Sequence, residues 1–376
     1  MAEPFKNLID ASLVRALGQQ LERHAPTFER RRFETLAIRG LTELELKSRA
    51  MQVCDALEQT LPAHFDHAAG LIEACLAPPR APGEATPAAD ADAGVTGWAV
   101  WPLAEYVARR GLATPERALQ CLHALTQRFT AEWSIRPFII QHPDLTWRTL
   151  QRWLADPSEH VRRLVSEGSR PRLPWGTQLR NLIADPTPTL PLLEVLQDDS
   201  SAHVRRSVAN HLNDIAKDHP ELLAQWLETH LPDAPAQRRT LLRHASRTLI
   251  KSGHARVLQA WGLGEHFNGT VDLALKPSRV KMGEQVELTL ALSSHARHAQ
   301  SIVVDYGVHH VKANGSTTLK VFKGWTLVLG PGEVRTLHKP HSFRPITTRT
   351  YHAGRHGIEL RINGQIVARK DFLLTR

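Results

Sequence analysis

The stretch DPSEHVRRLVSEGSRPRLPW, residues 156–175, predicts a short helix that stops abruptly before a tryptophan. Asp and Ser in its first positions are typical of a helix start. Small or apolar residues recur at helical spacing on one face, which predicts contact with a core: Val161, Leu164, Val165 and Gly168. Pro171 and Pro174 cannot continue the helix, so the chain breaks there and presents Trp175.

A second face of the same helix carries charge. Arg163, Glu167 and Arg170 stand at i, i+4 and i+7, so two guanidiniums flank one carboxylate. In isolation, an ion pair on a solvated face is the ordinary interpretation, because such a pair contributes only about 0.2–0.5 kcal/mol to helix stability. Repetition of the motif elsewhere in the chain argues for more than that.

The motif H-V-R-R-x-V occurs twice, at residues 160–165 and 203–208, with an offset of 43 residues. An amphipathic helix precedes each copy, and a weaker copy lies around residues 237–245. A two-helix unit of about 40–47 residues is typical of HEAT repeats, whose second helices line one groove. We therefore predict an all-α HEAT-like repeat array over residues 1–263. Residues 78–97, rich in Pro, Ala, Gly and Asp, are expected to form a flexible loop within it.

Residues 265–376 differ from the rest in pattern and in charge. Alternating or β-branched runs predict about seven short strands, and Asn314-Gly315 and Asn363-Gly364 predict hairpin turns. The expected fold is an all-β immunoglobulin-like sandwich. This part carries 16 Lys+Arg and 8 Asp+Glu, whereas the remaining residues carry 31 and 30. Such a basic excess favours a polyanionic partner, with nucleic acid the first candidate.

The most basic loop of this part is residues 341–356, which we expect to be exposed. It contains six basic side chains: His341, Arg344, Arg349, His352, Arg355 and His356. The pair His309-His310 is expected at the edge of a strand.

The sequence lacks the signatures of several classes of protein. No run of 18 apolar residues predicts a membrane span, and the first residues do not read as a signal peptide. The three cysteines are far apart, which argues against a disulfide framework and favours a reducing cytoplasm. The histidines show no zinc-binding spacing, and glycine-rich phosphate loops are absent. We therefore expect a cytoplasmic protein that needs no metal and no cofactor.

Superposing the two copies places further polar residues in the same groove. The second copy supplies Arg206, Asn210, Asn213 and the adjacent Asp214. One unit upstream, Arg128, Glu132 and Arg136 repeat the alternation of charge. The groove is therefore expected to receive three carboxylates ringed by arginines, namely those of Glu132, Glu167 and Asp214.

Carboxylates in an arginine-lined groove need a purpose other than DNA binding, because they repel phosphates. One such purpose is cleavage of an N-glycosidic bond, which develops an oxocarbenium-like cation on the sugar. A carboxylate can stabilise that cation and orient a water molecule. A nearby Trp face can bind a cationic base, with a cation–π contribution of about 0.5–2 kcal/mol.

The strings SIRPFI (134–139), HVRRLVSEGSRPRLPW (160–175) and HVRRSVANHLNDIAKDHP (203–220) resemble the AlkC family of bacterial DNA glycosylases, relatives of AlkD. The resemblance covers nearly the whole chain, including the helical array followed by an immunoglobulin-like domain. It implies excision of cationic alkylated bases, chiefly 3-methyladenine and 3-methylcytosine, from double-stranded DNA in base excision repair, without base flipping. The AlkD tryptophan pair has no obvious match, since Asn210 stands at one of its positions, so tolerance of bulky adducts is not implied.

The resemblance also assigns roles to residues. The expected catalytic residues are Glu132, Glu167, Trp175 and Asp214. The expected DNA-binding residues are Arg162, Arg163, Arg170, Arg172, Arg205, Arg206, Asn210 and Asn213 of the array and Arg344, Arg349 and Arg355 of the sandwich. The stretch 156–175 contains no lysine for a Schiff base, so we expect a monofunctional enzyme, which acts as a monomer.

A non-catalytic HEAT-repeat scaffold that binds nucleic acid or protein is the alternative, because such arrays are usually interaction modules. The two interpretations differ in what they expect of the three carboxylates. Convergence within reach of one nucleotide favours the enzyme, whereas divergence or burial in ion pairs favours the scaffold.

Overall fold

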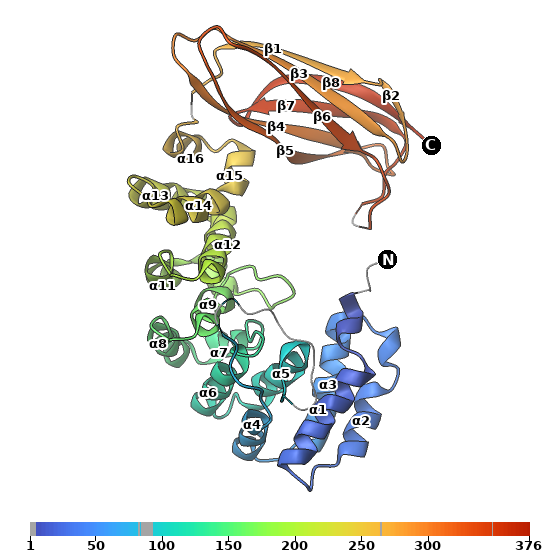
Figure 1. Cartoon of the computed structure of the whole chain (residues 1–376), viewed down its shortest axis with the longest axis vertical. Helices are drawn as coiled ribbons and strands as arrows, with labels where there is room; N and C mark the ends of the chain where they lie inside the picture. Colours follow the sequence, from blue (N-terminus) through green and yellow to red (C-terminus); the bar gives the residue numbers. More distant parts are fainter. Residues whose placement is uncertain (1–4, 82, 84–92, 264, 348) are drawn as a thin grey trace. The chain divides into compact units, whose positions relative to one another are not determined.

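The computed structural model describes residues 5–81, 83, 93–263, 265–347 and 349–376 (Figure 1). The chain forms two compact units. The first comprises Met1–Asp218 and Pro235–Ala245, and the second His219–Ala234 and Ser246–Arg376. The predicted boundary at residue 264 follows the change from helices to strands and stays a prediction. Within the described residues, no helix combines the length and the apolar character that crossing a membrane requires.

The named elements of the first unit are all helices within its described residues, with one isolated β-bridge between Leu76 and Val95. Its α-helices are α1 Ala11–His24, α2 Arg30–Ile38, α3 Leu46–Thr60, α4 Phe65–Ala74, α5 Val100–Arg110, α6 Pro115–Thr126, α7 Arg136–Gln141, α8 Pro143–Trp153, α9 Glu159–Gly168, α10 Arg180–Ala184, α11 Leu190–Leu196, α12 Ala202–Asp218 and α14 Ala236–Ala245. Its 3-10 helices are η1 Phe5–Leu8, η2 Leu41–Glu43, η3 Gly97–Ala99 and η4 Thr187–Thr189. Figure 1 shows α8, α9, α11 and α12 following one another along the repeats.

The two H-V-R-R copies form the same local structure at the starts of α9 and α12. Asp156 and Asp199 each accept a hydrogen bond from the backbone N–H two residues on, at 2.9 and 2.8 Å. The first arginine of each motif, Arg162 or Arg205, donates to two backbone carbonyls of the turn before its own helix. The apolar residues of α9 are fully buried, as predicted. Because both copies also form the same local structure, the helical repeats predicted from the sequence are confirmed.

The predicted flexible loop falls largely outside the described residues, which omit 82 and 84–92. Its described parts are held by hydrogen bonds. The Arg80 N–H donates to the Gln127 carbonyl at 3.3 Å, and the Gly83 N–H donates to a Glu159 carboxylate oxygen at 2.7 Å.

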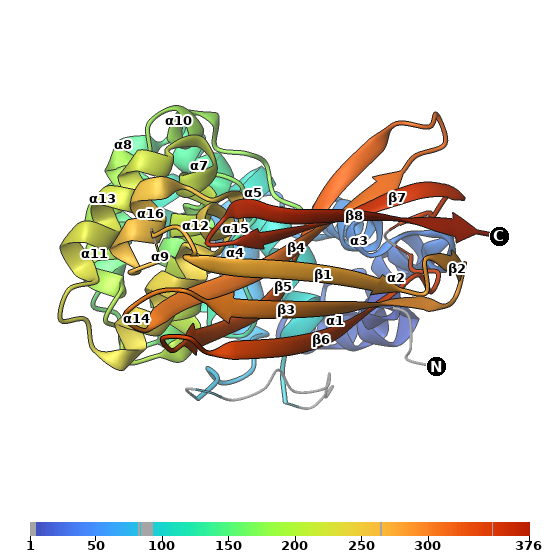
Figure 2. The same cartoon turned by 90° about the horizontal axis from the view of Figure 1, so that it is seen from above.

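The second unit combines three helices with eight strands in its described residues. The helices are α13 Pro220–His230, α15 Arg247–Ser252 and α16 Ala255–Ala260. The strands are β1 Gly269–Lys276, β2 Arg279–Lys281, β3 Gln285–Ser294, β4 Gln300–Val311, β5 Thr317–Leu329, β6 Val334–Ser342, β7 Gly354–Ile362 and β8 Gln365–Thr375. They form a three-stranded sheet, β1-β3-β6, and a five-stranded sheet, β2-β8-β7-β4-β5. Figure 2 shows the strands of the three-stranded sheet side by side.

Buried apolar residues alternate with more exposed ones along β3, and the buried ones form the core between the sheets. Leu288, Leu290 and Leu292 of β3 are fully buried, and so are Ile358 and Leu360 of β7. Both predicted hairpin turns are present: residues 314–315 join β4 to β5, and residues 363–364 join β7 to β8 with positive φ at both positions. The predicted β-sandwich is therefore confirmed.

Two sequence predictions about the histidines are wrong. His341 lies at the end of β6 and His356 within β7, where they are 6% and 0% exposed, so neither belongs to an exposed loop. His310 is not at a sheet edge, because β4 lies between β7 and β5, and its side chain is buried against Phe343 and Tyr351. Because β6 extends to Ser342 and β7 begins at Gly354, the loop between them is shorter than the predicted 341–356.

Gly168 tests the packing of α9. A Cβ atom there would lie 2.5 Å from Ile135 Cγ2, whereas a Cβ at Gly70, on the exposed side of α4, would meet nothing within 4 Å. Gly168→Ala is expected to lower the free energy of unfolding by about 1–3 kcal/mol through overpacking. Gly70→Ala is expected to raise it by about 0.5–1 kcal/mol through helix propensity. Chemical denaturation of both variants measures this, and a stabilising Gly168→Ala would contradict the packing.

His310 should make stability depend on pH. Burial, with the nearby Arg349 charge, lowers the pKa of His310 to about 3, and neither ring nitrogen has a hydrogen-bond partner among the residues that the structure describes. A folded pKa below the unfolded value of 6.5 means that stability is complete above pH 6.5 and falls as pH decreases, by about 1.4 kcal/mol per pH unit. His310→Phe should remove the part of the pH dependence that comes from His310, and it should therefore raise the free energy of unfolding at pH 5.

Urea denaturation between pH 7 and pH 4 measures the effect. The control is His298→Phe, because the side chain of His298 is exposed. An unchanged pH slope in His310→Phe would contradict the assignment.

Candidate functional site

Three carboxylates from three separate segments meet two arginines of one stretch. Arg163 Nη1 lies 2.8 Å from Glu132 Oε2, and Arg163 Nη2 lies 3.7 Å from Glu167 Oε1. Arg170 lies 2.5 Å from Glu167 Oε1 and 2.8 Å from Asp214 Oδ2. Acids and bases therefore alternate, and the structure brings together the three carboxylates that the sequence singled out.

Lys217 extends this series by one member. Its Nζ lies 2.8 Å from Asp214 Oδ1, one turn along α12. The i, i+3 spacing could have revealed the pair, but the sequence analysis missed it. We call Glu132, Arg163, Glu167, Arg170, Asp214 and Lys217 the charge network.

The acids of the charge network are buried. Glu132 is 8% exposed, Glu167 5% and Asp214 1%. Burial favours the neutral form of Glu167, but Arg163, Arg170 and a hydrogen bond from Ser207 outweigh it and hold the pKa of Glu167 below its ordinary value. The acids thus both converge and lie buried in ion pairs, so this geometry alone does not separate an enzyme from a scaffold.

Glu132 differs from the other two acids in one respect. Its Oε2 accepts hydrogen bonds from Thr130 and Arg163, at 2.8 Å each, whereas its Oε1 has no hydrogen-bond partner among the described residues. Both carboxylate oxygens of Glu167 and of Asp214 are engaged. Glu132 is therefore the acid with an oxygen available to a water molecule or a ligand.

The segment that carries Glu132 is not helical, contrary to the predicted i, i+4, i+8 alternation. Helix α6 ends at Thr126 and α7 begins at Arg136, so Glu132 lies in the turn between them. Arg128 donates to the carbonyls of Ala77 and Ala124 instead of lining a groove. The expectation that Arg128 lines the groove is therefore wrong, whereas Arg136 lies near enough to all three carboxylates to interact with them electrostatically but makes its hydrogen bonds to backbone carbonyls.

Arg136 instead fixes the segment that follows α9. It is fully buried and donates to the carbonyls of Gly168, Arg170 and Thr177 at 2.8, 2.8 and 2.6 Å. Burial, with the nearby Arg170 charge, lowers its pKa to about 10. The side chain remains charged at neutral pH and holds both ends of the segment that contains Trp175.

Trp175 projects from that segment with a positive φ of 63° and is 55% exposed. Its ring stacks with those of Trp101 and Trp133, whose centroids lie 6.2 and 6.4 Å from its own. The Trp133 indole N–H donates to the Pro174 carbonyl at 3.0 Å. Trp101 and Trp133 were missed by the sequence analysis, although Trp133 directly follows Glu132.

The arginines expected to bind DNA differ in the contacts that their side chains make within the protein. Arg206 is exposed, and it has no ion pair or hydrogen bond within the part of the chain that is described. Arg162 and Arg172 each form a two-bond ion pair, with Asp199 and Asp218 respectively. Among the described residues, the side chain of Arg205 donates to the turn before α12. Their phosphate contacts stay predictions.

The remaining expected contacts lie in both units. Asn210 lies 3.0 Å from the His244 ring, and Asn213 is 3% exposed. In the sandwich, Arg344 is exposed, and the exposed side chain of Arg355 lies 3.8 Å from Asp371. Arg349 is half-buried.

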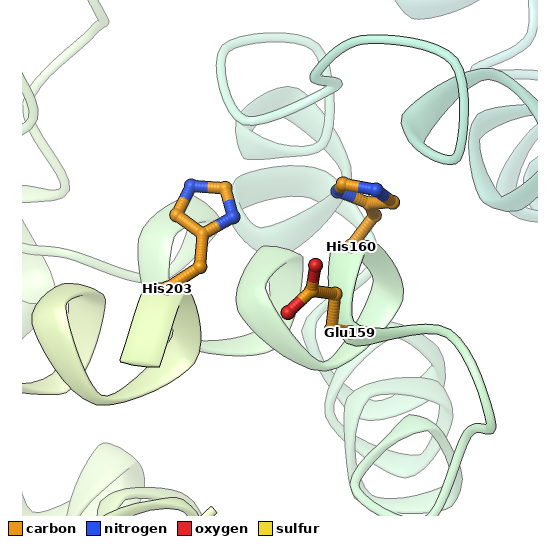
Figure 3. Close-up of side chains that lie close together, drawn as sticks. All are labelled: Glu159, His160 and His203. Carbon is orange, nitrogen blue, oxygen red and sulfur yellow. The ribbon is translucent and has the colours of Figure 1, made fainter. Parts of the chain in front are cut away.

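Glu159, His160 and His203 form the one group of potential metal ligands in the described residues (Figure 3). Their ligand atoms lie within 4.8 Å of one another. Both Glu159 oxygens, however, already accept hydrogen bonds, from Gly83 N–H and from Ser201. His160 Nδ1 lies 3.4 Å from the Arg80 guanidinium, whose charge disfavours a second cation. These contacts indicate a structural cluster rather than a metal centre.

Comparison with known proteins gives three matches. A family model described as "Uncharacterised protein YhaZ, C-terminal Ig-like domain" matches residues 270–376. The uncharacterized protein YhaZ of Bacillus subtilis (strain 168) is 34% identical over 374 residues, which cover 98% of each chain. A solved structure of Pseudomonas fluorescens alkylpurine DNA glycosylase AlkC, bound to DNA containing an abasic site analog, is 32% identical, covers 100% of both chains and has a TM-score of 0.91.

Arg170 should be essential to the fold of this site. Arg170→Met leaves Glu167 and Asp214 buried with a partner missing, so the free energy of unfolding is expected to fall by about 3 kcal/mol. Arg172→Met is the matched control, because the exposed pair of Arg172 with Asp218 contributes little. Urea denaturation at pH 7 compares the two. Equal stability of both variants would show that Arg170 does not offset the burial of the acids.

Proposed function

Because the chain belongs to the AlkC family of DNA alkylation glycosylases, we propose that it hydrolyses the N-glycosidic bond of cationic alkylated bases in double-stranded DNA. The proposed substrates are 3-methyladenine and 3-methylcytosine lesions. The products are the free base and an abasic site, as required for base excision repair. The proposed enzyme is monomeric and needs no metal or cofactor.

One observation carries the proposal: the charge network leaves Glu132 Oε1 unengaged while it uses every other carboxylate oxygen. A purely structural network gains most when all acceptors are paired. The unengaged oxygen belongs to the residue before Trp133, which stacks near the exposed Trp175. A carboxylate acceptor and a residue that contacts the exposed Trp175 ring are thus neighbours in the chain, and the proposal is that both face the same cationic nucleoside.

The chemistry follows from the charge of the lesion. An N3-methylated base is a cation, and it becomes neutral when the C1′–N bond breaks and its electron pair goes to the base. The leaving group therefore needs no general acid, and carboxylates can stay ionised, as the lowered pKa of Glu167 supports. The sugar becomes oxocarbenium-like, and carboxylates near it lower the energy of that state.

We assign the roles as follows. Glu132 Oε1 orients a water molecule toward C1′ and accepts its proton as the C–O bond forms. Glu167 and Asp214, each held on both oxygens, provide fixed negative potential. Trp175 contacts the cationic base with its face. Because Trp175 is exposed and not enclosed, this contact suits a base that is not flipped into a pocket.

Lys217 bears on the type of glycosylase. Its Nζ is engaged in an ion pair with Asp214 at 2.8 Å, which would have to break before this nitrogen could attack the sugar. This supports the proposal of a monofunctional enzyme that uses water. We further propose that Arg206 and the sandwich arginines Arg344, Arg349 and Arg355 contact DNA phosphates.

Release of 3-methyladenine and 3-methylcytosine from methylated duplex DNA tests the proposal. Glu132→Gln and Asp214→Asn are expected to lower the single-turnover rate about 100-fold or more, with DNA binding retained, because each removes a charge opposite the developing cation. Asp198→Asn is the matched control, since this exposed acid pairs with Arg238 outside the charge network. Circular dichroism establishes that each variant is folded.

The outcomes separate the two interpretations of the network. Full activity of a folded Glu132→Gln variant would remove Glu132 from the mechanism. Absence of base release by the wild-type protein, with DNA binding intact, would favour a helical-repeat scaffold, for which ion-paired acids need only be structural.

A further inference from the structure

A lysine far in sequence from the two H-V-R-R motifs contacts the segment that carries Trp175. Lys47, the second residue of α3, donates from its Nζ to the main-chain carbonyl of Trp175 at 2.8 Å. The two residues are 128 positions apart in the sequence. Lys47 is exposed, so the hydrogen bond lies at the surface of the unit. It therefore contributes less to the stability of the fold than a core contact does.

The backbone at Trp175 needs such support. Its φ of 63° is in the left-handed region, which is unfavourable for a bulky side chain. More than half of the side chain is exposed, so little packing compensates for this conformation. Conformations of this kind persist only where the surroundings determine them.

Side chains from other elements bind the carbonyls on both sides of Trp175. Trp133 binds the Pro174 carbonyl at 3.0 Å, and Arg136 binds the Thr177 carbonyl at 2.6 Å. The carbonyl of Trp175 itself is bound by Lys47. Rotation of the residue out of the left-handed region would turn that carbonyl away and break the bond.

We propose that Lys47 is a positioning residue that holds Trp175 in the conformation in which its ring faces the alkylated base. The proposal rests on the function proposed above, in which Trp175 contacts the lesion. Lys47 acts through the main chain of Trp175 and not on the substrate. Its charge is directed at a carbonyl dipole, which limits its repulsion of a cationic base.

Activity is the first test. Lys47→Met is expected to lower kcat by between about 10-fold and 100-fold, because the ring is misplaced, while KM stays within about twofold. Lys47→Arg, which can still donate to the carbonyl, is expected to recover most of the loss. Lys6→Met is the matched control: it removes the same charge from a lysine that pairs with Glu45 at the surface.

A double-mutant cycle asks whether the effect passes through Trp175. In a Trp175→Ala background, Lys47→Met is expected to cause no further decrease, since residues that act through one contact are not additive. Independent, additive losses would overturn the proposal.

A measurement without DNA keeps the two proposals separate. The protein labelled with 5-fluorotryptophan has nine fluorine resonances, one for each Trp. Trp175→Phe identifies the resonance of Trp175. Lys47→Met is expected to shift or broaden that resonance, Lys47→Arg to restore it, and Lys6→Met to leave it unchanged.

Two further results would overturn the proposal. One is an unchanged Trp175 resonance in folded Lys47→Met. The other is weaker DNA binding with a salt dependence reduced by about one charge and an unchanged kcat, which would make Lys47 a phosphate contact. Failure of the wild-type protein to release alkylated bases would refute the proposed function, whereas the fluorine resonances would still decide whether Lys47 holds Trp175.

Discussion

Burial of three carboxylates between helices constrains the whole first unit. Removing a carboxylate from water costs several kcal/mol, and only well-placed partners offset that cost. Arg163 and Arg170 provide the offset for Glu132, Glu167 and Asp214 together. Arg163 lies on α9, whereas Arg170 lies just beyond its end at Gly168, so both the orientation of α9 and the path of the chain after it determine which segments the two arginines bridge.

Close packing at Gly168 and the prolines that follow it explain where α9 ends. Gly168 packs so closely on Ile135 that no side chain fits, and the chain then leaves the helix. Arg136 binds the carbonyls released at this end, a buried cation held by backbone dipoles instead of a carboxylate. This leaves every acid of the charge network to its own partners, and it brings Trp175 to the surface in a fixed orientation.

Much of this architecture was predictable, because it is encoded locally. Helical and strand periodicities, the Asn-Gly turns and the repeated H-V-R-R motif each depend on a few adjacent residues. The failures are non-local. The spacing of Arg128 and Arg136 fits a helix, yet tertiary hydrogen bonds to carbonyls determine their positions. Basic composition made the segment around His341 and His356 look exposed, although both rings pack in an aromatic core. Nothing near Lys47 could reveal a partner 128 residues away.

The net charge of the charge network limits how it can act on a ligand. Its three acids and three bases cancel, so a cationic lesion gains little from net charge at a distance. Any gain must come from proximity to individual groups, since opposite charges inside one network screen each other beyond a few ångströms. Glu132 Oε1 is the acceptor that this network does not use. Thr130 and Arg163 hold one oxygen of this carboxylate in place, and the other oxygen is left for the water molecule of the proposed mechanism, so burial and the proposed chemistry are compatible.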